Sequence, residues 1–182
     1  MRNRAFTLVE VVITLGIAVT MLIVLLQFFI STNKQFAFQK TFVEVAQGAD
    51  DVALAVAELA LPAGQVLASR TFGTTTYQSG AQTLVLEIPS IDSSGAVISG
   101  TYDYAVFYVA AGKLYRITAV GSGSARKPGT RLMSENVTAL TFTYDNVTFA
   151  NVTSVTVSVT TAAGGTTHTV TQDIRLRNAP SS

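Results

Sequence analysis

The sequence predicts an α+β protein in which one long N-terminal helix packs on an antiparallel β-sheet. Three observations lead to this fold class. An uncharged, apolar segment covers residues 11–30. Apolar residues then recur at alternating spacings of four and three, which places them on one face of a helix. Beyond residue 62 the chain alternates apolar and polar residues between turn signals, as antiparallel strands do.

The apolar segment has the length of a membrane span. About 20 apolar residues, at a rise of 1.5 Å each, cover a hydrocarbon core of roughly 30 Å. Arg2 and Arg4 precede the segment, so the positive-inside rule predicts one crossing with the N-terminus in the cytoplasm. A secretory signal peptide has a shorter apolar core with its cleavage site behind it. We therefore expect a single-pass membrane anchor, with the following domain on the outer side.

Glu10 stands at the edge of this segment. A carboxylate in that position is costly to bury and rarely lacks a partner. Two interpretations of Glu10 are open. It is solvated at the level of the lipid headgroups, or it pairs with a cation of a neighbouring molecule. Opposite charges attract strongly in a low dielectric and an unpaired charge is penalised there, so pairing would set the register of an assembly.

Residues 4–10 read Arg-Ala-Phe-Thr-Leu-Val-Glu. This N-terminus resembles that of the bacterial type IV pilins and type II secretion pseudopilins. The resemblance implies that a prepilin peptidase cleaves between Ala5 and Phe6 and methylates the new amino group of Phe6. It also implies that Glu10 meets the amino terminus of a neighbouring subunit during assembly. Ala5 departs from the family, which usually has glycine before the cut, so we expect slower processing.

Several later segments are similar to the minor pseudopilins of the J type and the minor pilins of the W type. This likeness implies a minor subunit, one that starts or caps a filament. The segments are residues 84–86 (Leu-Val-Leu), 106–108 (Val-Phe-Tyr), 112–116 (Gly-Lys-Leu-Tyr-Arg), 135–142 (Glu-Asn-Val-Thr-Ala-Leu-Thr-Phe) and 175–178 (Arg-Leu-Arg-Asn).

We expect four parts along the chain: a leader (1–5), a transmembrane and assembly helix (6–30), its amphipathic continuation (31–61) and an antiparallel β head (62–182). One helix over residues 6–61 would be about 80 Å long, and Pro62 ends its pattern. The stripe of the continuation is expected to pack on this chain's own sheet. Its residues are Phe38, Phe42, Val45, Ala49, Val52, Val56 and Leu59.

The head pattern predicts strands at residues 83–88, 101–109, 113–120, 137–144, 154–161 and 166–177. Their alternation indicates a sheet with one polar and one covered face, and the helix stripe is the expected cover. Tyr102, Tyr104 and Tyr108 share one face of their strand, which we place under the helix. Residues 121–129 are small, polar and basic, and we expect a mobile loop there.

Composition fits an exported structural protein. Charged residues make up 13% of the 182 residues, against about 25% in average soluble domains. The chain has no cysteine, so it has neither disulfides nor thiolate metal ligands. The formal net charge is +1, and loss of Arg2 and Arg4 with the leader leaves ten basic against eleven acidic side chains. This balance offers no electrostatic basis for nucleic-acid binding.

No catalytic pattern is present in the sequence. His168 is the single histidine and falls in a predicted strand, so we interpret it as a packing or surface residue. Asp92 opens an Asp-Ser-Ser-Gly turn, which is typical of a local Asx turn, whereas a calcium site usually needs more carboxylates. We predict no catalytic residue, no cofactor and no metal site.

The resemblance implies the function of a minor pilin or pseudopilin, located in a bacterial cytoplasmic (inner) membrane and then in an extracytoplasmic filament. Its implied partners are other such subunits, the prepilin peptidase and the cytoplasmic membrane. Two alternatives stay open. One is a filament-tip module that binds DNA or a surface through the basic loop at residues 122–131. The other is an unprocessed single-pass membrane protein with an unknown activity.

Overall fold

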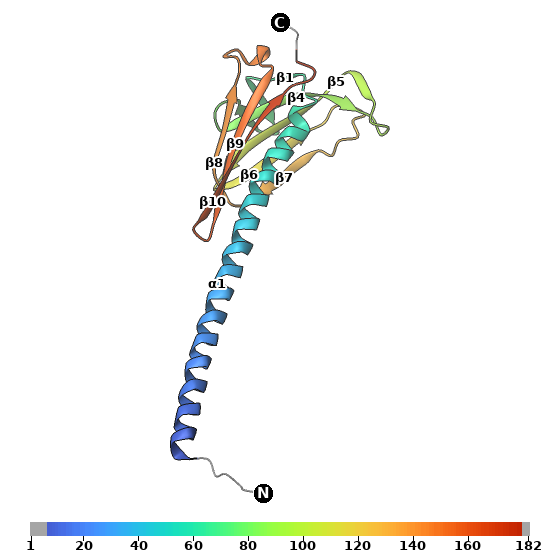
Figure 1. Cartoon of the computed structure of the whole chain (residues 1–182). Coiled ribbons are helices and arrows are strands. Elements are labelled where there is room, and N and C mark those ends of the chain that lie inside the picture. Colours follow the sequence, from blue (N-terminus) through green and yellow to red (C-terminus); the bar gives the residue numbers. More distant parts are fainter. Residues whose placement is uncertain (1–6, 180–182) are drawn as a thin grey trace. The chain divides into compact units, whose positions relative to one another are not determined.

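The computed structural model describes residues 7–179. The chain divides into two compact units, Met1–Thr41 and Phe42–Ser182, and the boundary lies within helix α1 (Leu8–Ala60). Figure 1 shows α1 as the single long helix of the described chain and the strands that follow it in sequence. The predicted long N-terminal helix is confirmed, with 53 residues. Phe6, its expected first residue, lies outside the described part.

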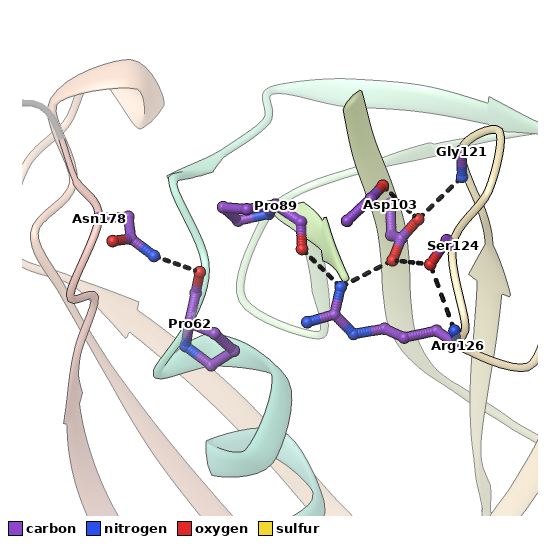
Figure 2. Close-up of polar contacts among 8 residues, drawn as sticks. Pro62, Pro89, Asp103, Gly121, Ser124, Arg126 and Asn178 are labelled. Carbon is purple, nitrogen blue, oxygen red and sulfur yellow. Dashed lines mark hydrogen bonds and ion pairs between the residues drawn. The ribbon is translucent and has the colours of Figure 1, made fainter. Parts of the chain in front are cut away.

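Helix α1 ends where proline removes a backbone donor. Pro62 has no N–H group and cannot continue the helical hydrogen-bond ladder. The last turn closes with Leu61 N–H donating to the Ala57 carbonyl over 2.9 Å. The chain's C-terminal segment then satisfies two carbonyls beyond the helix. Arg177 N–H donates to the Leu61 carbonyl (2.9 Å), and the Asn178 side chain donates to the Pro62 carbonyl (2.8 Å; Figure 2).

The strands form three antiparallel sheets in the described chain, where we had expected one. The first has the order β1 (Gln65–Val66), β4 (Thr83–Ile91), β5 (Val97–Ala110), β6 (Lys113–Ala119), β7 (Gly129–Ser134). The second has the order β10 (Thr166–Arg175), β9 (Ser154–Ala163), β8 (Val137–Tyr144). The hairpin β2 (Ser69–Phe72) and β3 (Thr75–Gln78) forms the third, and a short 3-10 helix, η1 (Phe149–Asn151), precedes β9.

The main core lies between the last turns of α1 and the inner faces of the two larger sheets. The helix contributes Val45, Ala49, Val52, Val56 and Leu59, as predicted, and each is at most 6% exposed. The prediction was wrong for Phe38, which is 61% exposed. Phe42 is 44% exposed but contacts the ring of His168 on β10. The buried part of the stripe begins at Val45. The sheets supply Leu84, Leu86, Ile88, Ala105, Phe107, Leu114, Leu140, Phe142, Val155, Val157, Val159 and Ile174.

A second, smaller core lies on the opposite face of the five-stranded sheet. Phe72 of the β2–β3 hairpin packs there on Val85 and Val106, with Tyr104 and Tyr108 beside them. Successive side chains of a strand point to opposite faces. Since Ala105 and Phe107 belong to the helix-side core, Tyr104 and Tyr108 point away from α1. The expectation that these tyrosines lie under the helix was therefore wrong, and the hairpin covers them instead. Tyr102 is 42% exposed.

Strand boundaries differ from the prediction where pairing overrides local preference. Pro89 does not end its strand, because β4 continues to Ile91 through an irregularity in its pairing with β5. Strands β1, β2, β3 and β7 were not predicted, whereas β8 matches its prediction residue for residue. The predicted strands at residues 101–109 and 113–120 correspond to β5 and β6, which form a hairpin with Ala110 paired to Lys113.

Candidate functional site

The first candidate site is the start of α1. Thr7 precedes the helix, and its hydroxyl accepts a hydrogen bond from Glu10 N–H over 3.4 Å. In return, the Glu10 carboxylate accepts from the Thr7 N–H and hydroxyl groups, each over 3.5 Å. This reciprocal pattern is a capping box, Thr-x-x-Glu, which satisfies backbone donors that the first helical turn leaves open. This local role of Thr7 and Glu10 was not predicted, although their spacing of three residues signals it.

The geometry leaves the Glu10 carboxylate available for a further partner. The residue is exposed, and its two bonds to Thr7 are at the long limit of hydrogen bonding. The positive end of the helix dipole lies at the same turn and favours a negative charge there. Ala5 and Phe6, the predicted processing residues, lie outside the described residues.

The segment behind Glu10 carries its apolar side chains on its surface. Within residues 8–30 every large apolar side chain is between 48% and 83% exposed in the single chain. Helix α1 is the one described helix that is long and apolar enough to cross a membrane. A helix that is apolar all round needs lipid or other protein as its surroundings, so this part of α1 fits a membrane span or a signal anchor.

The second candidate site is a buried ion pair in the head. The Asp103 carboxylate on β5 is 0% exposed, and Arg126, from the loop between β6 and β7, donates to it through Nη1 over 2.7 Å. The same Nη1 donates to the Pro89 carbonyl over 2.6 Å. Ser124 Oγ (2.7 Å) and Gly121 N–H (2.8 Å) complete the contacts from the loop (Figure 2). A fourth donor to the carboxylate, Ser90 Oγ at 2.7 Å, comes from β4.

These donors decide the charge state of Asp103. Burial alone would raise the pKa of this carboxyl, but the hydrogen bonds from Gly121, Arg126, Ser124 and Ser90 outweigh burial and hold its pKa below the ordinary value. Position 121 must be glycine for this arrangement. A Cβ there would clash with the Thr101 side chain and would lie 2.8 Å from the Tyr102 carbonyl oxygen.

The ion pair changes our interpretation of the basic loop. We had expected residues 121–129 to form a mobile loop, and one open alternative had the basic loop at residues 122–131 binding DNA. Instead the guanidinium of Arg126 is held by Asp103 and Pro89, and Ala125 N–H donates to the Ile91 carbonyl over 2.7 Å. Lys127 and Arg131 are exposed, but two cations are a small electrostatic footprint for nucleic acid. We call the Asp103–Arg126 ion pair, together with its hydrogen bonds, the clasp, because it ties the loop to β4 and β5.

The remaining sequence candidates have local structural roles. His168 packs edge-to-face against Phe42, with ring centroids 6.1 Å apart. The Asp92 carboxylate accepts from Ser94 N–H (2.8 Å), Ser94 Oγ (2.6 Å) and Ala96 N–H (3.0 Å), which confirms the Asx turn. These hydrogen bonds lower the pKa of Asp92, and the bond from the Ser94 side chain has the largest effect. Across residues 7–179, no cluster of three His, Cys, Asp or Glu side chains has the geometry of a metal site.

Comparisons of this chain with protein-family models, with curated proteins and with solved structures found no match. The functional interpretation therefore depends on the residues and on their geometry.

Proposed function

We propose that this chain is a minor pilin or pseudopilin, a membrane-anchored structural subunit of a type IV pilus or a type II secretion pseudopilus. In this role it performs no chemistry. Its anchor moves laterally from lipid into a bundle of similar helices, and its head stays on the outer side of the membrane. This proposal implies the type IV pilin fold, in which the first part of the helix is the membrane anchor and the last part contributes to the core of the head.

The observation that carries the proposal is the combination at the start of α1. An exposed carboxylate, Glu10, sits in the first turn of a helix whose next 20 residues are uncharged. In a helix bundle this carboxylate would leave water, which is costly unless a cation meets it. The amino terminus of Phe6 in a neighbouring, processed subunit supplies such a cation. A subunit seated one step out of register would leave Glu10 unpaired, so the pair would fix the axial step of the filament.

The clasp weakens the alternative in which the loop of the head binds DNA. Arg126, the central cation of residues 122–131, already has its partners. We therefore place the proposed function in the helix.

Glu10 has a capping role as well as its proposed pairing role, and two substitutions separate them. Glu10→Gln retains the capping box, in which glutamine replaces glutamate, but removes the charge. We expect Glu10→Gln and Glu10→Ala chains to reach the membrane in normal amounts and to be absent from sheared filaments. Asp50→Ala, which removes an exposed carboxylate from the same helix, should be incorporated normally. Incorporation of the Gln variant at the wild-type level would contradict the proposal.

A further inference from the structure

The first unit of the chain carries a strict seven-residue repeat of bulky side chains. Leu8, Leu15, Leu22, Phe29 and Phe36 stand at identical spacing along α1, and we call them the heptad row. Residues seven apart on a helix lie on nearly the same face. Each member of the row is at least 59% exposed in the single chain. The row continues into residues 31–41, where the segment is mostly polar and Phe36 is 64% exposed.

A repeat of this kind predicts helix–helix pairing. A strict seven-residue repeat over four intervals favours a left-handed supercoil, in which each bulky residue fits between residues of the facing helix. Lipid alone would favour no such period, because it solvates every face of an apolar helix equally.

We propose that the heptad row is the contact through which two copies of this chain pair side by side, in parallel and in register, while both are anchored in the membrane. The inference goes beyond the proposed filament role and needs only that α1 spans the membrane. Two copies inserted with the same topology are necessarily parallel, with equal residues at equal depth. In that arrangement each member of the heptad row lies at the same depth as the same residue of the other copy, so the two rows can contact each other along their length.

The polar residues beside the row are compatible with an in-register pair. In a parallel pair, Gln35 of one helix faces Lys40 of the other, so a neutral amide meets the cation and no like charges are opposed. Lys34 and Glu10 lie off the contact. Glu10 therefore stays accessible to a different partner, and pairing through the row does not consume the carboxylate that filament entry requires.

The chain offers a matched control for the row. Phe38 has the same side chain as Phe36 and almost the same exposure, 61%. Two residues correspond to about 200° around a helix, so Phe38 faces the opposite direction. Val24 and Ser31 precede Phe38 at the same seven-residue spacing and form a control row.

The absence of cysteine from the sequence makes single-cysteine cross-linking a clean test. Full-length Leu22→Cys, Phe29→Cys and Phe36→Cys chains are oxidised in native membranes, beside Val24→Cys, Ser31→Cys and Phe38→Cys. Each variant is made with two different tags in the same cells, so that a mixed dimer proves pairing of two copies. We expect several-fold more mixed dimer at positions 22, 29 and 36 than at 24, 31 and 38. Equal yields in the two rows, more dimer in the control row, or dimers with another protein alone would overturn the proposal.

A second arm separates this pairing from filament assembly. The Phe36→Cys cross-link is repeated in a Glu10→Gln chain, which we expect to be excluded from filaments. The cross-link should persist at the same yield, because Glu10 lies outside the row. Loss of the cross-link in that chain would show that the contact exists in the filament and not between anchored copies, which contradicts the inference. A further check places the single cysteine at position 22. Adding Phe36→Ala to the Leu22→Cys chain should reduce the yield of cross-linked dimer, whereas adding Phe38→Ala should not.

Discussion

Two carboxylates of this protein differ in surroundings and therefore in role. Glu10 is exposed and makes long hydrogen bonds within its own helical turn, so its charge is available for a partner. Asp103 is 0% exposed and is met by four donors at 2.7–2.8 Å. A buried carboxylate with that many donors is satisfied internally. These surroundings support the proposed assembly role of Glu10 and a structural role of Asp103.

Replacing Asp103 by asparagine should destabilise the head and change its response to acid. Breaking a buried ion pair costs about 3 kcal/mol or more, and Arg126 would lose its charged partner. The pKa of Asp103 lies below its ordinary value of 3.8, so its contribution to stability is present above that pH and is lost as the pH falls through the folded-state pKa. All six tyrosines lie at or beyond residue 77 and the chain has no tryptophan, so near-UV circular dichroism of the detergent-solubilised chain reports on the head.

The exposed Asp173 provides the control for this measurement. Asp173→Asn should unfold at nearly the wild-type denaturant concentration at pH 7. Between pH 5 and pH 3, wild type should lose stability faster than Asp103→Asn. Parallel pH profiles for the wild type and Asp103→Asn would show that the clasp does not control acid stability.

Single residues differ in how far the sequence could predict their roles. The Thr-x-x-Glu spacing of the capping box is local, so it was predictable from Thr7 and Glu10 alone. The donors to Asp103 come from residues 13 to 23 positions away, and a loop had to fold back to bring them together. Sequence reasoning could not foresee that Arg126 is held by Asp103.

At the scale of elements, a tyrosine joins the two larger sheets. Tyr144 at the end of β8 donates through Oη to the carbonyls of Gly80 (3.0 Å) and Thr83 (3.1 Å), which lie beside and at the start of β4. Burial raises the pKa of Tyr144 to about 12. Burial, with Tyr77 adjacent, raises that of Tyr108 to about 12 as well. The hydroxyl of Tyr144 is therefore an internal connection between sheets.

Removal of that hydroxyl should be measurable in two ways. Tyr144→Phe should lower the free energy of unfolding by about 1 kcal/mol, the typical worth of a hydrogen bond, whereas Tyr102→Phe, at an exposed position, should have little effect. In ultraviolet titration, Tyr108 and Tyr144 should still be protonated at about pH 11 in the wild type, and Tyr144→Phe should lose one of these late ionisations. Ionisation of all six wild-type tyrosines near pH 10, with the fold intact, would contradict the raised pKa values of Tyr108 and Tyr144.

The helix contributes to the head core through one face. Val52 is 0% exposed, whereas Val43, on the same helix, is 49% exposed. Val52→Ala should cost about 2 kcal/mol, because removal of buried methyl groups loses transfer free energy and leaves a cavity. Val43→Ala should cost less than about 0.5 kcal/mol. Denaturant unfolding of both variants checks this, and equal destabilisation would contradict the assigned face.

Pairing between distant segments explains which elements the sequence could predict. Strand β8 has strong alternation and was predicted with its correct limits. Strand β7 reads Gly-Thr-Arg-Leu-Met-Ser, which shows little alternation, and it is a strand because β6 pairs with it. The hairpin β2–β3 is short and polar, with a turn at Gly73 whose φ is +61°. The second core requires this hairpin, and no local sequence pattern predicted that core.

At the scale of the whole molecule, the chain combines a unit with no buried core and a unit with two cores. Across residues 8–41 the helix buries no side chain, so this unit needs lipid or other helices around it. The β strands and the last turns of α1 form the second unit, which has its own core. The long exposed apolar helix segment and the β-rich part that follows it were predictable from apolar length and alternation. The head's three sheets and its clasp were not, since they depend on contacts between distant segments.

The mass of the N-terminal peptide from the native, membrane-extracted protein tests the filament proposal most directly. The account predicts a chain that begins at Phe6 and carries one added methyl group on its amino nitrogen. That terminus supplies the cation which the Glu10 carboxylate of a neighbouring subunit is proposed to meet. A native chain that retains residues 1–5 would contradict the account, because its charged leader would occupy the place of the pairing amine.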